Sequence, residues 1–249
     1  MYETDELLAQ YLLLHYGKKE DVLPWTFGPF AALDYPARCV SELVDRKRLT
    51  PGSTALDLGC AVGRSSFELS KICDAVKGID LSRRFIEISQ DLARHGTITF
   101  PCPIEGAIRK ELTFHVPKGA RGDRISFEIG DAGALPHQLG TFDVVLNANL
   151  VDRLADPKTF LHQLHRYVAP GGQLILSSPF TWLNSFTAHD QWLGGYMKEG
   201  TSRWTWDEIC RILQDEFSLV FDTDLPFLIR EHARKYQWSV AHAGRWIRR

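Results

Sequence analysis

The residues most suggestive of chemistry lie in a glycine-containing segment, residues 55–63, which reads ALDLGCAVG. Its apolar first half predicts a buried strand, and Gly59 and Gly63, with small Ala61 between them, predict a tight loop where that strand ends. Such a loop lets the backbone lie directly against a flat ligand such as a nucleoside. The candidate ligand-binding residues in this segment are Asp57, Gly59, Cys60 and Gly63.

Two other nucleotide-binding patterns compete for this loop. A dinucleotide fingerprint, G-x-G-x-x-G, that starts at Gly59 would have Arg64 as its third glycine, where a large side chain prevents close helix–strand packing. A Walker loop needs Gly-Lys followed by Ser or Thr, and this tripeptide does not occur. The pattern D-x-G-x-x-x-G from Asp57 to Gly63 instead resembles the first motif of class I methyltransferases. That resemblance implies S-adenosylmethionine as cofactor, with S-adenosylhomocysteine as product.

Polar residues also end the next predicted strands. Asp80 follows the strand at 75–79, where a carboxylate can accept hydrogen bonds from both ribose hydroxyls. Asp131 follows the strand at 125–129, where the methyltransferase pattern places an acceptor for the adenine amino group. Ligands of open parallel sheets bind at the carboxyl ends of the strands. The expected cofactor contacts therefore include Asp80, Leu81, Asp131, Ala132 and Asn147, the last of which ends the strand that begins at residue 142.

The elements that must position these residues alternate along the chain. Strands are predicted at 54–58, 75–79, 125–129, 142–146, 173–178, 219–222 and 236–246. Between them, helices are predicted at 4–16 with Thr4 as cap, at 36–44, from about 64, after the Ser82 cap, over the stripe 160–168 that Pro170-Gly171-Gly172 ends, and from a capping box at Thr205. This order predicts an α/β fold with a doubly wound, mostly parallel, seven-stranded Rossmann-like methyltransferase sheet.

We expect residues 1–249 to form one domain with three additions to the sheet. Residues 1–50 form an N-terminal helical cap, and residues 96–124 form an inserted β-hairpin. Residues 179–204 are rich in aromatic side chains and follow the fifth strand, so they are expected to form a lid over the pocket.

The composition narrows the class of partner. A formal net charge of −2 gives no global field that would attract nucleic acid or an anionic membrane, and basic residues near the C-terminus are interpreted as a solvated strand edge and tail. No apolar run approaches the roughly 20 residues of a membrane span. The five cysteines are odd in number and scattered, which predicts no metal site and a reducing, cytoplasmic location.

Motifs near both ends of the chain resemble a particular family. They are Tyr2-Glu3-Thr4 with Tyr11, His15-Tyr16-Gly17, Tyr35-Pro36-x-Arg38-Cys39, and the segments at 224–231 and 234–240. Together they resemble the 4-mercaptohistidine N1-methyltransferase family, which includes the C-terminal domain of the ovothiol biosynthesis enzyme. The resemblance implies methyl transfer to a ring nitrogen of 5-thiohistidine, and a functional link to a separate iron-dependent sulfoxide synthase.

Position and resemblance together nominate further site residues. Asn149, Asp152 and Arg153 follow the fourth strand and are expected to contact the substrate, with Trp182 as a wall that stacks on its ring. The sequence supports equally well the interpretation that Asp152 and Arg153 are an exposed pair of charged residues at the start of a helix. The family motif adds Arg230 and Tyr236, for which strand-edge packing is the alternative. For the cofactor we expect Tyr16 to cover it and Arg38 to meet its carboxylate, unless Arg38 is a surface arginine.

Three other functions remain open from the sequence. The acceptor could be another amino acid or a hydroxylated metabolite. The chain could also be a non-catalytic S-adenosylmethionine-binding module. A nicotinamide oxidoreductase is disfavoured by Arg64.

Overall fold

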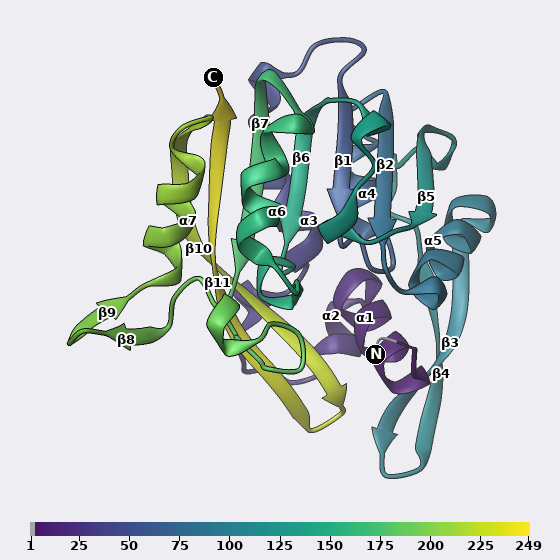
Figure 1. Ribbon diagram of the computed structural model, residues 1–249. Coiled ribbons are helices and arrows are strands. Elements are labelled where there is room, and N and C mark those ends of the chain that lie inside the picture. The colour runs from purple at the N-terminus through teal and green to yellow at the C-terminus, as the bar shows by residue number, and fades with distance from the viewer. Residues whose placement is uncertain (1–2) are drawn as a thin grey trace.

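A seven-stranded sheet forms the centre of the computed structural model, which describes residues 3–249; Tyr2 of the first motif lies outside them. Its strand order is β10-β11-β7-β6-β1-β2-β5 (Figure 1). Neighbouring strands from β7 to β5 pair in parallel, while β11 is antiparallel to both β7 and β10. The predicted doubly wound, mostly parallel sheet is confirmed. The strands are β1 (Thr54–Leu58), β2 (Ala75–Asp80), β5 (Ile125–Ile129), β6 (Phe142–Ala148), β7 (Val168–Ser178), β10 (Phe217–His232) and β11 (Lys235–Arg248).

Helices cover both faces of this sheet, as its two-sided apolar strands require. The helices α3 (Tyr35–Ser41), α4 (Arg64–Leu69) and α5 (Arg83–His95) lie on one face, and α6 (Pro157–Gln163) and α7 (Thr205–Leu213) lie on the other (Figure 1). Ser82 caps α5 as predicted, since its Oγ accepts a hydrogen bond from the Phe85 amide at 3.2 Å. The helix predicted at 36–44 corresponds to α3, which ends earlier than expected, at Ser41.

The N-terminal residues lie next to the carboxyl ends of the strands. Helix α1 (Asp5–Tyr16) crosses below the carboxyl ends of β1 and β2, and α2 (Lys19–Val22) follows it (Figure 1). Thr4 caps α1 as predicted by accepting from the Leu7 amide at 3.3 Å. The buried side of α1 packs against β10, β3 and α3, so residues remote in sequence meet above the sheet.

Two hairpins extend beyond the sheet. The predicted insertion is confirmed: β3 (Thr97–Glu105) and β4 (Ile108–His115) form a separate antiparallel pair (Figure 1). The last two strands are much longer than predicted, because β10 continues to His232 and pairs with β11 well past the edge of β7. The polar residue Asp224 and the strand-disfavouring Pro226 interrupt the apolar pattern there. Packing of β10 on α1 and α3 nevertheless stabilises the extended strand.

Two other helix boundaries differ from those predicted from the sequence. Pro170-Gly171-Gly172 does not end a helix but forms an irregularity inside β7, where the register with β6 shifts. Thr205 does not cap α7: the cap residue is Trp204, and the Thr205 hydroxyl instead accepts from Trp182 Nε1 at 3.0 Å. The Thr205 hydroxyl therefore forms a tertiary hydrogen bond instead of the capping hydrogen bond that the sequence predicted.

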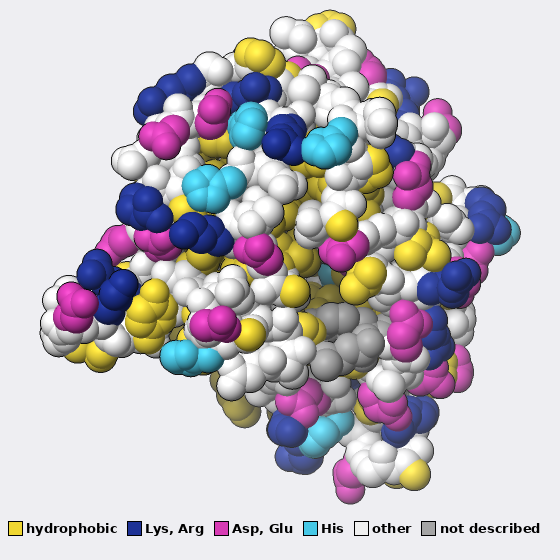
Figure 2. Space-filling view, viewed as in Figure 1, with side chains coloured by type: hydrophobic (Ala, Val, Ile, Leu, Met, Phe, Trp, Pro, Cys, Tyr) yellow, Lys and Arg dark blue, Asp and Glu magenta, His cyan; other side chains and the backbone are white. Residues whose placement is uncertain are grey.

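The region expected to form a lid contains a small hairpin, β8 (Tyr196–Lys198) and β9 (Thr201–Arg203), that projects away from the sheet (Figure 1). Short 3₁₀ turns occupy Phe30–Ala32, Arg46–Arg48, Gly122–Arg124, Ala132–Ala134, His137–Leu139, Val151–Arg153, Leu164–Arg166 and His189–Gln191. Within residues 3–249, no helix is both long and apolar enough to cross a membrane. Basic and acidic side chains are interspersed on the face shown in Figure 2.

Candidate functional site

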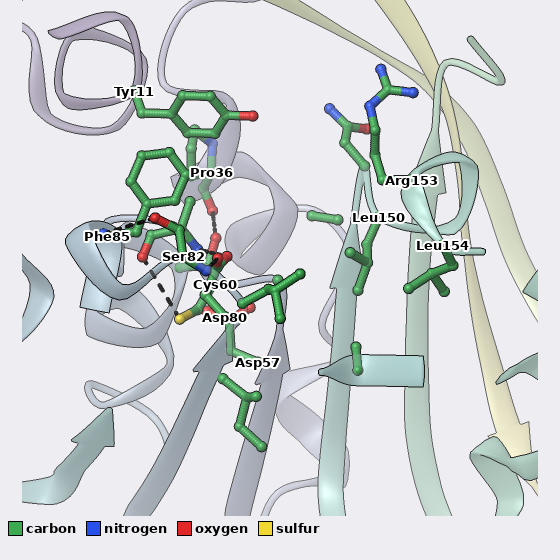
Figure 3. A pocket seen from close by; sticks show the side chains of 18 of the residues that line it. Tyr11, Pro36, Asp57, Cys60, Asp80, Ser82, Phe85, Leu150, Arg153 and Leu154 are labelled. Carbon is green, nitrogen blue, oxygen red and sulfur yellow. Dashed lines mark hydrogen bonds between the residues drawn. The ribbon is translucent and has the colours of Figure 1, made fainter. Parts of the chain in front are cut away.

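A cavity of about 440 Å³ opens between α1 and the carboxyl ends of β1, β2, β5 and β6. This volume falls in the range of small-molecule sites. Its walls come from the loop after β1, the end of β2 and start of α5, the segments after β5 and β6, helices α1 and α3, and β10 (Figure 3). The sheet therefore brings its strand-end residues into one site, as the general rule for open parallel sheets predicts.

The loop after β1 has the conformation that its glycines suggested. Gly59 has φ +70°, and a Cβ there would lie 3.2 Å from the Leu150 side chain. Gly63 has φ +85°, and a Cβ there would lie 2.8 Å from the Phe127 ring. Even Ala61 adopts a left-handed conformation, with φ +47°. Gly59 and Cys60 line the cavity, whereas Gly63 lies behind it and allows α4 to begin close to Phe127.

Three carboxylates lie at the ends of three neighbouring strands around this cavity. Asp57 is 2 % exposed and accepts from Ser66 Oγ at 2.6 Å, and burial raises the pKa of its carboxyl to about 7. Asp80 accepts from the Ala61 and Ser82 amides, each at 2.8 Å. It thus joins the glycine loop to the start of α5, and burial also raises its pKa. Asp131 also lines the cavity and accepts from the Gly133 amide at 2.8 Å.

The remaining expected cofactor contacts divide into two groups. Leu81 and Ala132 line the cavity, and Leu81 is 72 % exposed. Asn147 lies outside the lining and is fully buried. It has the same register as Leu58 and Leu176, and among the residues described its carboxamide atoms have no hydrogen-bond partner.

The structure places Tyr16 and Arg38 away from the roles expected for them. The Tyr16 hydroxyl donates to the Val62 carbonyl at 2.6 Å, so this side chain supports the glycine loop from behind. Arg38 donates to the carbonyls of Ala31 and Pro226 and pairs with Glu42. These bonds tie α3 to β10, and neither residue lines the cavity.

The structure brings Asn149 and Arg153 together on the wall opposite Tyr11 (Figure 3 labels Arg153 and Tyr11). Arg153 Nη1 donates to the Thr181 carbonyl at 2.8 Å and lies 3.2 Å from Asp152 Oδ2, while its guanidinium lies 5.0 Å from the Phe186 ring centroid. Asp152 is fully buried below Arg153 and outside the cavity lining. Burial raises the pKa of Asp152, and the neighbouring guanidinium opposes that rise. Asp152 is therefore placed to hold Arg153 rather than a ligand.

The three other expected substrate contacts lie outside this cavity. Trp182 packs on Trp192 at a centroid distance of 6.2 Å and donates to Thr205, so it is a core residue of the α7 face. Arg230 is 3 % exposed and donates to the carbonyls of Asp21 and Pro103, which joins β10 to α2 and β3. Tyr236 accepts from Trp25 Nε1 at 3.2 Å and donates to the Ala233 carbonyl. Of the expected lid, only Ser185 and Phe186 line the cavity.

Several lining residues were not expected from the sequence. Tyr11 and His15 come from α1, Tyr35 from α3 and Phe227 from β10. His15 Nδ1 accepts from the Arg64 amide at 3.3 Å, and burial lowers the pKa of His15 to about 3, so the ring is neutral. Each belongs to a motif that resembled the thiohistidine family, which was the one available signal. Periodicity could not locate them, because their elements meet the sheet through tertiary packing alone.

The cavity fits a nucleoside with an attached amino acid. Gly59 lines the cavity and has no side chain, which permits close approach of a ligand to its backbone. Asp80 at the end of β2 retains acceptor capacity for ribose hydroxyls, since each carboxylate oxygen accepts only one of the hydrogen bonds described above. Within residues 3–249, no group of three His, Cys, Asp or Glu side chains is placed to bind a metal ion.

Comparison with known proteins agrees with this geometry. Two family models, each described as a methyltransferase domain, match residues 56–176 and 118–244. Ajmaline N-methyltransferase of Rauvolfia serpentina is 28 % identical over 57 % of this chain and 41 % of its own length. Methyltransferase GfsG of Streptomyces halstedii is 26 % identical over 70 % of this chain and 54 % of its own. The chain thus spans about half the length of the curated relatives it matches.

Solved structures show the same fold. An S-adenosylmethionine-dependent methyltransferase from Methanosarcina mazei is 17 % identical, with a TM-score of 0.54 over 81 % of this chain and 94 % of that one. N-methyltransferase NodS from Bradyrhizobium japonicum, in complex with S-adenosylhomocysteine, is 16 % identical, with a TM-score of 0.51 over 96 % and 97 %. The second family model alone covers more than half of the chain. The chain therefore belongs to the methyltransferase domain family of class I S-adenosylmethionine-dependent methyltransferases.

Proposed function

We propose that this protein transfers a methyl group from S-adenosylmethionine to a ring nitrogen of 5-thiohistidine, the reaction that completes ovothiol. The observation that carries the methyl-transfer part is that Asp57, Asp80 and Asp131 line one cavity together with the glycine loop. This arrangement matches the ribose, adenine and methionine ends of the cofactor. The nearby N-methyltransferase relatives support nitrogen as the methylated atom.

The other half of the cavity supports a flat acceptor that carries an anionic group. Its walls include the aromatic rings of Tyr11, Phe186 and Phe227, and its polar groups include Asn149 and the guanidinium of Arg153. Aromatic faces suit an imidazole ring, and a guanidinium suits a carboxylate or thiolate. 5-Thiohistidine carries an imidazole ring, a carboxylate and a thiolate.

The bound cofactor would supply a methyl group activated by a positive sulfonium. An imidazole nitrogen already carries a lone pair near neutral pH, so acid–base catalysis has little to contribute. In the proposed reaction that lone pair forms the N–C bond, the C–S bond breaks, and its electron pair stays on sulfur. The protein's task is to hold the nitrogen in line at about 3–3.5 Å and to exclude water, for which Tyr11, Leu150 and Phe186 line the cavity.

A thiohistidine acceptor must be made by a sulfur-inserting enzyme. We propose that a separate iron-dependent sulfoxide synthase provides it, in keeping with the family that the terminal motifs resemble. Coexpression of the two proteins with histidine and a thiol donor would then yield the methylated product, whereas either protein alone would not.

The direct test is an acceptor panel. The purified protein is incubated with S-adenosylmethionine and 5-thiohistidine, histidine or phosphoethanolamine, and methylated products are measured by mass spectrometry. We expect turnover with 5-thiohistidine and much slower turnover with histidine. Equal rates for these two acceptors would refute the substrate, and efficient methylation of another acceptor would replace it.

A non-catalytic cofactor-binding module is the candidate from another class. It predicts that S-adenosylhomocysteine binds in calorimetry while no acceptor in the panel is methylated. The open half of the cavity beside the glycine loop favours an enzyme, because a module that only binds the cofactor has no need of it.

A further inference from the structure

A buried hydrogen-bond network lies behind the acceptor half of the cavity. The Tyr35 hydroxyl donates to Asn149 Oδ1 at 2.8 Å and lies 2.8 Å from Ser177 Oγ. A hydroxyl has one proton, so with that proton on Asn149 it must accept from Ser177. Tyr35 is 3 % exposed and Ser177 is fully buried, and the Tyr35 ring packs 4.9 Å from that of Phe227. Tyr35 is thereby fixed from both sides.

This network determines which side of the Asn149 carboxamide faces the cavity. Its oxygen is directed to Tyr35, so its Nδ2 group is left as the side available to a ligand. Among the described residues, the Asn149 side chain makes its hydrogen bond through Oδ1 and none through Nδ2, and Asn149 is partly exposed. The backbone of Asn149 is fixed too, with φ +54° and its amide donating to the Ser177 carbonyl at 2.8 Å. Asn149 therefore presents two N–H donors in one orientation.

Arg153 adds a second donor group on the same wall. Its Nη1 is occupied by the Thr181 carbonyl and Asp152, whereas Nε and Nη2 donate no hydrogen bond to any residue between 3 and 249. Its guanidinium lies against Phe186, which also lines the cavity. The carboxylates that line the cavity are Glu3, Asp57, Asp80 and Asp131, which belong to the N-terminal segment and to the ends of β1, β2 and β5 rather than to this wall.

We propose that Tyr35 is a positioning residue that holds the Asn149 carboxamide as a donor, and that Asn149 and Arg153 together bind an anionic group on the acceptor, of the thiolate class. This inference rests on the proposed function and narrows it, because it makes the anionic group a requirement for binding. A hydrogen bond from a charged or polar donor to an anion is worth more than one to a neutral group. The site thus distinguishes a thiolate-bearing imidazole from imidazole alone.

The test measures binding rather than turnover. Calorimetry gives the dissociation constants of 5-thiohistidine and histidine for the complex with S-adenosylhomocysteine. The readout is the dissociation constant of histidine divided by that of 5-thiohistidine. We expect the wild-type protein to bind 5-thiohistidine at least about tenfold more tightly. Tyr35→Phe frees the carboxamide to rotate and is expected to lower this ratio by about 3- to 10-fold.

Asn149→Asp is the second variant. Aspartate keeps the acceptor for Tyr35 and tolerates a left-handed backbone, but it replaces the donor by a negative charge. We expect it to abolish the preference for 5-thiohistidine. Tyr167→Phe is the matched control, because this buried hydroxyl donates to the Leu135 carbonyl at 3.1 Å and lies outside the cavity; its ratio should equal that of the wild type.

The outcomes separate the inference from the proposed function. A purely structural role of Tyr35 would weaken both ligands equally and leave the ratio unchanged in Tyr35→Phe, which would overturn the inference. Equal affinities of the wild-type protein for the two ligands, or binding of neither, would overturn it as well. Failure of S-adenosylhomocysteine itself to bind would instead refute the cofactor half of the proposed function.

Discussion

The protonation of Asp57 is expected to make the stability of the ligand-free protein depend on pH. Its carboxyl is buried against the glycine loop, and the nearby Asp80 carboxylate adds to the rise of its pKa to about 7. In the unfolded chain the same carboxyl has its ordinary pKa of 3.8. Between these two values the folded protein binds more protons than the unfolded chain. The free energy of unfolding contributed by Asp57 is therefore complete below pH 4 and is lost as the pH rises to about 7.

The size of this effect follows from the shift. Each pH unit in the window is worth about 1.4 kcal/mol, so between pH 5 and pH 8 the contribution falls by about 3 kcal/mol. The assay is urea unfolding of wild type and Asp57→Asn at pH 5, 6, 7 and 8 without cofactor. The difference between their free energies of unfolding should change by this amount, with wild type losing stability as the pH rises.

Two further variants sharpen this test. Ser66→Ala removes the hydroxyl that donates to Asp57 at 2.6 Å, so the pKa of Asp57 should rise and the window should extend to higher pH. Asp91→Asn removes one exposed carboxyl from α5 and controls for the loss of charge. If the difference between wild type and Asp57→Asn is the same at all four pH values, Asp57 is not protonated in the folded protein and the reasoning is refuted.

Three other predictions concern the loop and its supports. Asp80→Asn leaves one of two backbone amides without an acceptor and should raise the dissociation constant of S-adenosylhomocysteine by about tenfold or more in calorimetry; an unchanged constant would exclude Asp80 from the site. Gly63→Ala should lower the free energy of unfolding by about 1–3 kcal/mol, because of its φ and its contact with Phe127. Gly96→Ala, with φ +75° and nothing within 4 Å, separates the two causes, and equal losses would show that crowding is irrelevant. Arg38→Ala should lower the melting temperature but leave cofactor affinity unchanged, and a weaker affinity would restore its expected role.

The central sheet and the first half of the site could be read from local sequence. The strand 54–58 and the caps at Thr4 and Ser82 were predicted correctly because apolar runs and side-chain caps act within a few residues. Gly59, Asp80 and Asp131 could be placed at one edge of the sheet, since the carboxyl ends of parallel strands meet there. The Pro170 irregularity and the length of β10 could not, because both depend on a neighbouring strand or on packing against α1.

The side of the cavity that contains Asn149 and Arg153 shows most clearly what the sequence could not predict. Asn149 and Arg153 were expected near a ligand from their place after a strand, and both line the cavity. Asp152, between them in sequence, is fully buried and does not line it. Trp182 and Arg230 were expected to contact substrate, yet one packs in the core and the other joins three separate segments. Aromatic and cationic side chains serve packing as readily as binding, so their type alone does not decide between these uses.

The sequence by itself determined the nucleoside-binding loop, the alternation of strands and helices that follows it, and the acidic strand ends, since each depends on patterns along a few residues. Only the tertiary structure decided what covers the cavity and which polar atoms face it. Tyr11, His15 and Tyr35 reach the site because α1 packs over the strand ends and contacts α3, which begins at Tyr35. The hydrogen bond from Tyr35 to Asn149 joins residues 114 positions apart, and its direction depends on a third residue, Ser177. No local pattern carries that information, because it exists only once the chain has folded.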